Sequence, residues 1–303
     1  MPLVDTSVQL GLKTSPSAPN AFGDHVWFRG DDDLLWKMPV AHPADVVNPQ
    51  GMKTLSTPTP CIDGYVYFQG EGNKLIMMQQ EAPYLHANLG DVACWAPPTA
   101  PGDGYVYVRD GAGKLVRVQT RGEAAGTMTR YAVYTAWQVA VHIGTGASPV
   151  RYVFFADGRT YKLKRLDLNA QSVAEYGSFK KLLDAPVMGS NGKLYIADES
   201  HDAHEVDPTT ATTTTKLFGS AKSTPVTSQF GFDGNIYWRA VGDALNKAAV
   251  TAPGTATELS TTSATPDPVG DGYVVFLGED SHIHRVAVTP TGDTTVVVQS
   301  VNH

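Results

Sequence analysis

The sequence has little that would support export, membrane insertion or nucleic-acid binding. Only 2 of its 303 residues are cysteines, too few for the disulfide framework of a small secreted domain. No apolar run approaches the roughly 18 residues of a membrane-spanning helix, and residues 1–11 lack the basic start and apolar core of a signal peptide. We expect a soluble protein without membrane insertion, either cytoplasmic or released without a secretory signal peptide.

Charged residues and helical patterns are also scarce. Charged residues make up 17% of the chain, the formal net charge is −7, and the two signs are interspersed, so we expect no nucleic acid as a partner. The best candidate for an amphipathic helix, residues 170–183, is interrupted by Gly177. With 42% hydrophobic residues, this composition indicates a globular protein rich in strands.

The sequence does contain a repeat. A short strand pattern, here called the repeat strand, recurs at intervals of 38 to 47 residues. Its copies begin at His25 (HVWFRG), Tyr65 (YVYFQG), Tyr105 (YVYVRD), Tyr152 (YVFFAD), Lys193 (KLYIAD), Asn235 (NIYWRA) and Tyr273 (YVVFLG). Most copies follow an Asp-Gly or Asn-Gly pair, which favours the tight turn of a β-hairpin, and each is followed by another strand pattern.

Four short antiparallel strands per unit at this period are typical of a β-propeller blade. The sequence therefore predicts an all-β fold in a single domain, residues 1–303, as a seven-bladed β-propeller with four antiparallel strands per blade. Residues 7–13 and 294–300 lie outside the repeats. We expect one or both to complete the last blade, so that N- and C-terminal strands close the ring. The fourth copy has an extra loop at residues 144–149, after an innermost strand expected at residues 136–143.

The repeat unit is a small residue plus Pro, a strand, Asp-Gly, a YVYF-type strand, Gly and a KL-type strand. It resembles the repeats of quinoprotein-like (PQQ-type) propellers, and it is similar to the hairpins of bacterial and fungal propeller lectins. This resemblance covers nearly the whole chain and implies the propeller fold and a lectin role. The chain lacks the adjacent cysteine pair of the quinone dehydrogenases and is too short for their eight-bladed disc, so we expect no cofactor.

Side chains alternate between two faces along a strand, and one face of the repeat strand is apolar in every copy. On the other face, an aromatic residue precedes a polar one by two positions in four copies: Trp27 and Arg29, Tyr67 and Gln69, Tyr107 and Arg109, and Tyr237 and Arg239. Because rings stack on sugars and Arg or Gln can orient them, these pairs predict a repeated carbohydrate site. Alternatively, the rings pack between blades and the arginines pair with turn aspartates.

The leading hypothesis is a non-catalytic lectin whose partner is a glycan or another small-molecule ligand, bound at several similar sites on the blades. The alternative is an enzyme, a lyase, hydrolase or cyclase, with a single pocket at the mouth of the central channel. Its candidate catalytic residues are His142, Trp137 and His86, near the extra loop. A protein–protein interaction scaffold is a further alternative.

Three clusters contain residue types found at metal sites. His282 and His284 share one face of a strand, and a second cluster comprises His201, Asp202, His204 and Glu205. Each alone lacks a full tetrahedral set, so we expect no metal. The acidic run of residues 31–33 lacks the spacing of a calcium loop and indicates a hairpin tip. Cys61 and Cys94 are expected to be buried thiols, with a structural disulfide as the alternative.

Overall fold

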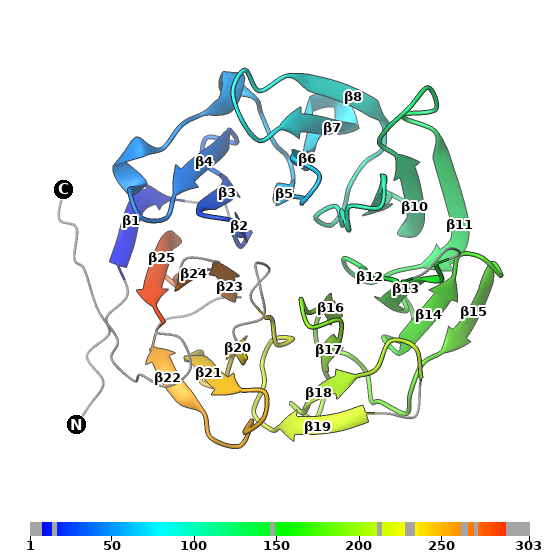
Figure 1. Ribbon diagram of the computed structural model, residues 1–303, viewed down its shortest axis with the longest axis vertical. Coiled ribbons are helices and arrows are strands. Elements are labelled where there is room, and N and C mark those ends of the chain that lie inside the picture. The colour runs from blue at the N-terminus through cyan, green and yellow to red at the C-terminus, as the bar shows by residue number, and fades with distance from the viewer. Residues whose placement is uncertain are drawn as a thin grey trace.

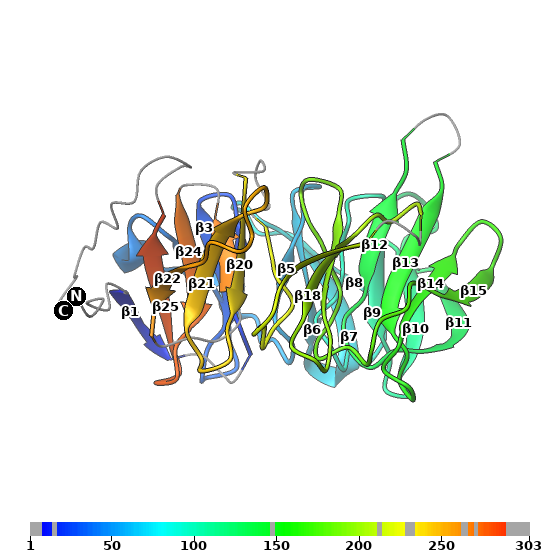
Figure 2. The ribbon, with the colours of Figure 1, turned by 90° about the horizontal axis from the view of Figure 1, so that it is seen from below.

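The computed structural model describes residues 8–13, 17–145, 149–210, 214–227, 234–261, 266–269 and 272–288. Its strands pair into separate antiparallel sheets that stand around a common centre (Figure 1). From the side, the sheets form a disc and their strands run across its thickness (Figure 2). Helical structure in these residues is limited to the short turns η1 (Pro43–Asp45), η2 (Pro49–Gly51) and η3 (Glu71–Asn73). No helix among them is long and apolar enough to cross a membrane.

Consecutive strands build each sheet from the centre of the ring towards its rim. The first two sheets comprise β2 (Asn20–Phe22), β3 (His25–Arg29) and β4 (Leu35–Pro39), then β5 (Thr59–Pro60), β6 (Tyr65–Gly70), β7 (Lys74–Gln79) and β8 (His86–Asp91). The next two comprise β9 (Tyr105–Arg109), β10 (Lys114–Gln119) and β11 (Met128–Tyr134), then β12 (Ala140–Ile143), β13 (Arg151–Ala156), β14 (Leu163–Asp167) and β15 (Ser172–Glu175).

The remaining sheets complete the circuit. One comprises β16 (Val187–Met188), β17 (Leu194–Ala197), β18 (Ala203–Val206) and β19 (Thr214–Phe218), and the next comprises β20 (Asn235–Arg239), β21 (Leu245–Ala249) and β22 (Thr257–Ser260). The last contains β23 (Pro266–Val269), β24 (Tyr273–Leu277) and β25 (His282–Ala287). The repeat strands are thus β3, β6, β9, β13, β17, β20 and β24, which confirms their predicted positions.

Some sheets have three strands where the repeat predicts four. In the β9–β11 sheet the innermost strand is reduced to the bridge between Thr99 and Tyr107, and in the β20–β22 sheet to the bridge between Val226 and Tyr237. A proline directly precedes Thr99 and another precedes Val226. Because proline has no N–H to donate, Pro98 and Pro225 add no ladder hydrogen bond of their own in front of these bridges. In the β2–β4 sheet, residues 47–53 cover the outer edge through isolated bridges.

The N-terminal strand joins the last sheet. β1 (Val8–Lys13) pairs antiparallel with β25, with Val8 opposite Arg285 and Lys13 opposite His282. The prediction that residues 7–13 join the last sheet is therefore confirmed for β1. Residues 294–300 lie outside the described residues.

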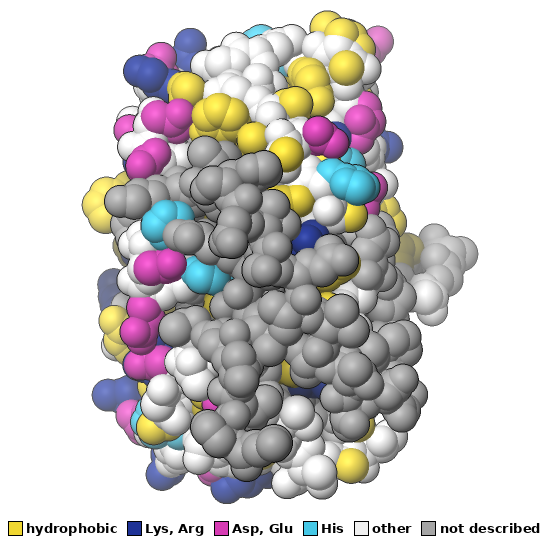
Figure 3. All heavy atoms as spheres, turned by 90° about the vertical axis from the view of Figure 1, so that its left-hand side faces the viewer, with side chains coloured by type: hydrophobic (Ala, Val, Ile, Leu, Met, Phe, Trp, Pro, Cys, Tyr) yellow, Lys and Arg dark blue, Asp and Glu magenta, His cyan; other side chains and the backbone are white. Residues whose placement is uncertain are grey.

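On this side of the ring, acidic, basic and hydrophobic side chains are interspersed over the described surface (Figure 3).

Neighbouring sheets are joined by one repeated contact. The residue in the middle of each repeat strand is 0 to 1% exposed and shares a core cluster with two apolar residues of the next sheet's repeat strand. These groups are Trp27 with Val66 and Phe68, Tyr67 with Val106 and Val108, Tyr107 with Val153 and Phe155, Phe154 with Leu194 and Ile196, Tyr195 with Ile236 and Trp238, Tyr237 with Val274 and Phe276, and Val275 with Val26 and Phe28. The last group joins β24 to β3, so the contacts run around the whole ring.

The segments that connect consecutive sheets form a recurring backbone hydrogen bond with the next repeat strand. Five of them cross the end of the next repeat strand and donate a backbone N–H to the carbonyl of its last or second-last residue, at 2.7 to 3.0 Å. The pairs are Leu55 to Gln69, Trp95 to Arg109, Ala136 to Ala156, Leu183 to Ala197 and Lys222 to Arg239. These five sheets are therefore hydrogen-bonded to the chain that leaves the sheet before them.

The Asp-Gly turns stabilise the buried tyrosines. Tyr67 donates its hydroxyl hydrogen to Asp63 at 2.7 Å, and Tyr107 donates to Asp103 at 3.1 Å. The glycine after Asp103 has a φ of 84°, a left-handed conformation that glycine adopts without strain. Arg151 of the next sheet lies 3.5 Å from Asp103. Burial raises the pKa of Asp103, against the hydrogen bonds and arginines that lower it.

Both cysteines are free and buried. Cys61 and Cys94 lie in the core cluster between the second and third sheets. Burial raises the pKa of both thiols to about 12, so they are unreactive at neutral pH. The expectation of two buried thiols is confirmed.

We predict that Tyr107→Phe lowers the free energy of unfolding by about 1–2 kcal/mol, because Asp103 loses a hydrogen-bond donor in a buried site. Urea unfolding measures this change. Tyr134→Phe is the matched control, because that side chain is 38% exposed and should change stability by less than about 0.5 kcal/mol. Equal stability of the Tyr107 variant and the wild type would contradict the role of this bond.

Candidate ligand-binding site

The structure buries the four aromatic residues that were predicted to bind sugar. Trp27, Tyr67, Tyr107 and Tyr237 each have 0 or 1% of their surface exposed. From the sequence, one face of the repeat strand was expected to form the core and the other to contact a ligand. In a ring every sheet has a neighbour on each side, so both faces are covered. The rings pack between sheets, as in the alternative interpretation, and present no face to a ligand.

The polar residues of the predicted pairs contact hairpin turns. Three of them reach the residue four positions later: Arg29 to Asp33 at 2.9 Å, Gln69 to Asn73 at 2.7 Å, and Arg239 to Asp243 at 2.7 Å. Each partner has a left-handed φ between 61° and 68°, which Asp and Asn tolerate better than most residues. In the β9–β10 turn this position is Gly113, and Arg109 donates instead to the carbonyl of Thr135 at 2.7 Å. These side chains stabilise the conformation of the hairpin turns.

The three candidate catalytic residues do not converge. His86 was expected near the extra loop of the fourth copy, but it is exposed on β8, the rim strand of the β5–β8 sheet. Trp137 packs against Tyr161 with ring centroids 5.4 Å apart, whereas His142 stacks on Tyr152 with centroids 6.2 Å apart. His142 follows Trp137 by five residues, a separation of about 16 Å when the chain is extended. Burial lowers the pKa of His142, but no partner for acid–base chemistry adjoins it among the candidates.

A cavity of about 400 Å³, here called the axial cavity, lies where the inner segments of the sheets meet. This volume is in the range of pockets that hold small molecules. Its polar side chains come from six different sheets or the segments before them: Asn20, Thr59, Thr99, Gln138, Ser190 and Thr227. Among the described residues that line it there is no Asp, Glu, Lys, Arg or His. The described part of the lining is therefore neutral.

Hydrogen bonds between adjacent sheets hold this lining in place. Each runs from a side chain of one inner segment to the backbone of the next: Asn20 to the carbonyl of Pro58 at 2.6 Å, Thr59 to Pro98 at 2.7 Å, and Thr99 to Val139 at 2.8 Å. In the same way, the N–H of Ser190 donates to the hydroxyl oxygen of Thr227 at 3.0 Å. The inner segments are thus tied to one another around the axis.

These hydrogen bonds determine which donors and acceptors of the lining remain free to contact a ligand. A threonine hydroxyl has one hydrogen to donate and two lone pairs. Because Thr59 and Thr99 donate that hydrogen to neighbouring carbonyls, their oxygens keep acceptor capacity. A ligand with several O–H donors and no charge matches such a lining. The apolar part, which includes Pro60, Pro101 and Pro186, matches the carbon skeleton of the ligand.

Sequence reasoning missed the axial cavity, although a signal was present. The small-residue-plus-proline pairs were interpreted only as strand starts, yet Ala185 and Pro186 line the cavity, and Thr59 and Pro60 directly follow such a pair. A prolyl residue in an edge strand leaves no unpaired N–H towards the centre. Inner-strand prolines recurring at the repeat period therefore mark the axis of the ring.

A second cavity, of about 380 Å³, lies between β11 and the β13–β14 hairpin. The guanidinium of Arg159 lies 5.0 Å from the ring centroid of Tyr134. Asp157 accepts hydrogen bonds from Lys164 at 2.7 Å and from the hydroxyl of Thr160 at 3.0 Å. Burial alone would raise the pKa of Asp157, but these hydrogen bonds outweigh it and hold that pKa well below its usual range. This cavity is charged, unlike the axial cavity.

Comparisons with known proteins bear on the fold. No protein-family model and no curated protein matches the sequence. Among solved structures, the crystal structure of BamB from Moraxella catarrhalis is similar, with a TM-score of 0.51 over 91% of this chain and 84% of that chain, at 12% identity. Together with the ring of antiparallel sheets, this likeness decides the architecture. The chain has an all-β, propeller-like fold. At this identity the likeness concerns the fold of the propeller and not its ligand.

We predict that Asp157→Asn destabilises the propeller near pH 7 and that the difference from the wild type shrinks as the pH falls below about 4. The folded-state pKa of Asp157 lies below the unfolded value. The ionised carboxylate therefore contributes stability above the unfolded pKa, and this contribution is lost as the pH falls through the folded pKa. Urea unfolding between about pH 7 and pH 3 measures it.

Asp45→Asn is the control for this experiment, since Asp45 lies in the short turn η1, which buries no residue. Its stability should follow the wild type at every pH. A deficit of the Asp157 variant that stays constant across the pH range would contradict the assigned linkage.

Proposed function

We propose that this chain is a seven-bladed β-propeller that binds a neutral carbohydrate in its axial cavity and does not catalyse a reaction. The blade number is supported by the seven copies of the repeat strand and by the inter-sheet contacts that return from β24 to β3. Four strands per blade are supported by the isolated bridges at the inner or outer edge of the three-stranded sheets. In this proposal β1 supplies the outermost strand of the last blade.

The observation that carries the binding proposal is the neutral lining of the axial cavity. A sugar has no charge and presents several hydroxyl donors, and the described lining offers hydroxyl and amide oxygens without ionisable side chains. General acid–base catalysis needs a titratable group within hydrogen-bond reach of the substrate. The described lining has none, which favours binding over the alternative of an enzyme at the channel mouth.

A single axial site also differs from the repeated sites expected from the sequence. The four predicted rings are buried between sheets, and this favours one site on the axis over several between the blades. The ligand would be bound by groups from several blades at once. Binding would then depend on the closed ring as a whole.

We predict that a glycan array probed with the full chain identifies a neutral glycan and that Thr99→Val weakens its binding about tenfold. The hydroxyl of Thr99 donates to Val139 and leaves its oxygen as an acceptor in the cavity. Isothermal titration calorimetry with the identified sugar measures the affinity. Ile62→Trp should also reduce it, because Ile62 lines the cavity and is 76% exposed, so the larger ring narrows the opening at little cost in stability.

The matched control is Thr135→Val. Thr135 is 1% exposed, lies outside the axial cavity, and its hydroxyl has no hydrogen-bond partner among the described residues. This variant should bind as the wild type does. Unchanged affinity in both cavity variants would exclude the axial site. Absence of glycan binding together with a stable protein partner would favour a scaffold, and turnover of a glycan would favour an enzyme.

A further inference from the structure

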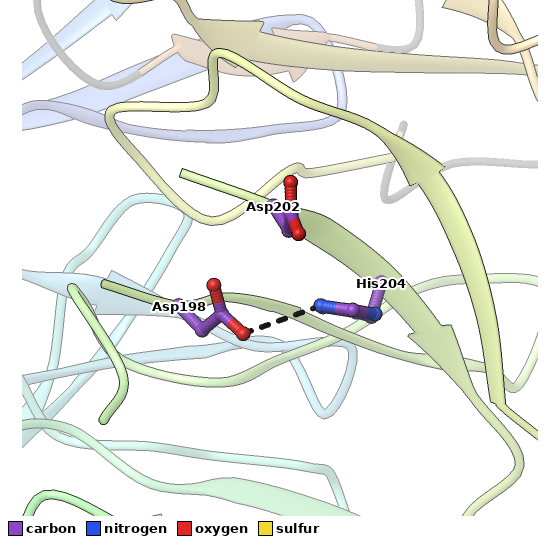
Figure 4. A group of neighbouring side chains, drawn as sticks. All are labelled: Asp198, Asp202 and His204. Atoms are coloured by element: carbon purple, nitrogen blue, oxygen red, sulfur yellow. Dashed lines mark ion pairs between the residues drawn. The ribbon is translucent and has the colours of Figure 1, made fainter. Parts of the chain in front are cut away.

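Three potential metal ligands converge at the turn between β17 and β18 (Figure 4). Asp198 directly follows β17, Asp202 directly precedes β18, and His204 lies within β18. One carboxylate oxygen of each aspartate and one imidazole nitrogen of His204 all lie within 4.8 Å of one another. Together they form a mixed nitrogen and oxygen donor set.

The geometry of the turn produces this convergence. The N–H of Asp198 donates to the carbonyl of Asp202 at 3.0 Å, and the N–H of His201 donates to the carbonyl of Asp198 at 2.7 Å. His201 has a φ of 61°, which reverses the chain within the turn. Asp202 and His204 are two residues apart, so their side chains lie on the same face of the strand. The backbone hairpin therefore places all three ligands together.

Asp198 and the ligand nitrogen of His204 are buried and in ion-pair contact with each other (Figure 4), but that nitrogen lacks a hydrogen bond. Asp198 is 5% exposed. Its Oδ1 accepts the N–H of Ser200 at 2.9 Å, but its Oδ2 lies 3.5 Å from Nε2 of His204, which is longer than a hydrogen bond. That buried nitrogen has no hydrogen-bond partner among the described residues. Buried polar atoms in folded proteins are normally hydrogen-bonded. This nitrogen without a hydrogen bond is therefore a candidate to coordinate a metal ion.

The corresponding turn between β24 and β25 provides an internal comparison. Ser281 has a φ of 63°, like His201, and His284 follows it by three residues, as His204 follows His201. In that turn Nε2 of His284 lies 3.0 Å from Asp280, so a hydrogen bond satisfies the imidazole. The β17–β18 turn differs in having Ser200 at the position of Asp280 and aspartates at the positions of Gly278 and His282. Its imidazole nitrogen is not hydrogen-bonded.

A lysine from the rim strand partly neutralises the cluster. Nζ of Lys216 on β19 lies 2.8 Å from Asp202, and the lysine side chain is 57% exposed. This hydrogen bond lowers the pKa of Asp202. Because the ammonium group is at the surface, it can move into water when another cation approaches Asp202. Lys216 is therefore a competitor for this carboxylate.

We propose that Asp198, Asp202 and His204 bind a divalent transition-metal ion of the Zn²⁺ class, with water completing the coordination. Zn²⁺ binds imidazole nitrogen at about 2.0–2.1 Å and carboxylate oxygen at about 2.0–2.2 Å, which places tetrahedral ligand atoms roughly 3.4 Å apart. The 3.5 Å between Asp198 and His204 already matches this spacing. A side-chain rotation of Asp202 away from Lys216 brings in the third ligand. Imidazole together with carboxylate suits Zn²⁺ better than Ca²⁺ or Mg²⁺.

This proposal departs from the expectation that no metal binds at this cluster. In the sequence, His201 and Glu205 were grouped with Asp202 and His204, but both have other partners. Nδ1 of His201 lies 2.9 Å from the carbonyl of Ala221, and Glu205 accepts the hydroxyl of Tyr195 at 3.1 Å. The potential metal ligand that the sequence cluster did not include is Asp198, which lies on the other side of the turn.

Titration of Zn²⁺ into the untagged, chelator-treated full chain tests the proposal. We expect one ion per chain by isothermal titration calorimetry and a higher melting temperature with Zn²⁺, because an ion that binds the folded state stabilises it. Asp202→Asn should weaken binding on the order of tenfold or more. The side chain of Asp202 is 24% exposed, so its amide variant should fold. Lys216→Met should strengthen binding, because it removes the competing ammonium, and a purely structural ion pair would not produce that result.

The matched control is Asp280→Asn in the β24–β25 turn, which should leave Zn²⁺ affinity unchanged. Absence of binding to the wild type at about millimolar Zn²⁺ would overturn the proposal. So would equal losses in the Asp202 and Asp280 variants, or weaker binding in Lys216→Met. None of these residues lines the axial cavity, so this result and the glycan experiment can fail independently.

Discussion

The contact between the middle of one repeat strand and the apolar pair of the next is the interaction on which the rest of the structure depends. An aromatic side chain buries about 150–250 Å², which corresponds to about 4–6 kcal/mol of hydrophobic free energy before entropic costs. The same contact recurs around the ring, from Trp27 against Val66 and Phe68 to Val275 against Val26 and Phe28. Every sheet therefore needs both neighbours, and the ring has no sheet that could be removed without exposing two cores.

This constraint decides where ligands can be bound. Since both faces of each sheet are covered, ligand-binding groups must lie at the axis, at the hairpin turns or at the rim. The axial cavity is lined by inner segments whose side chains also hydrogen-bond to the next blade, as Thr99 does to Val139. The groups proposed to bind a ligand thus also hold the blades together. A sugar there would be recognised by positions that the fold itself keeps in place.

The hairpin turns show how one backbone geometry serves different purposes. In several blades a left-handed residue of the turn accepts a hydrogen bond from the end of the repeat strand, as Asn73 does from Gln69. In the β17–β18 turn the left-handed position is His201, and the residues around it bring Asp198, Asp202 and His204 together. These turns share one backbone conformation. Their side chains decide whether a turn contains a structural hydrogen bond or the proposed metal site.

The sequence by itself determined the positions of the repeat strands, the turns between them, the buried thiols and the attachment of an N-terminal strand to the last sheet. These features are local, or follow from repeating a local pattern, and hydrophobic alternation and Asp-Gly pairs report them directly. Only the tertiary structure decided that Trp27 and its equivalents are buried, that Thr59 and Thr99 line a neutral cavity, and that Asp198 completes a cluster with His204. Alternation shows that a strand has two faces but not what covers each one. The covering residues come from the neighbouring blade, about forty positions away, and only the closed ring brings them into contact.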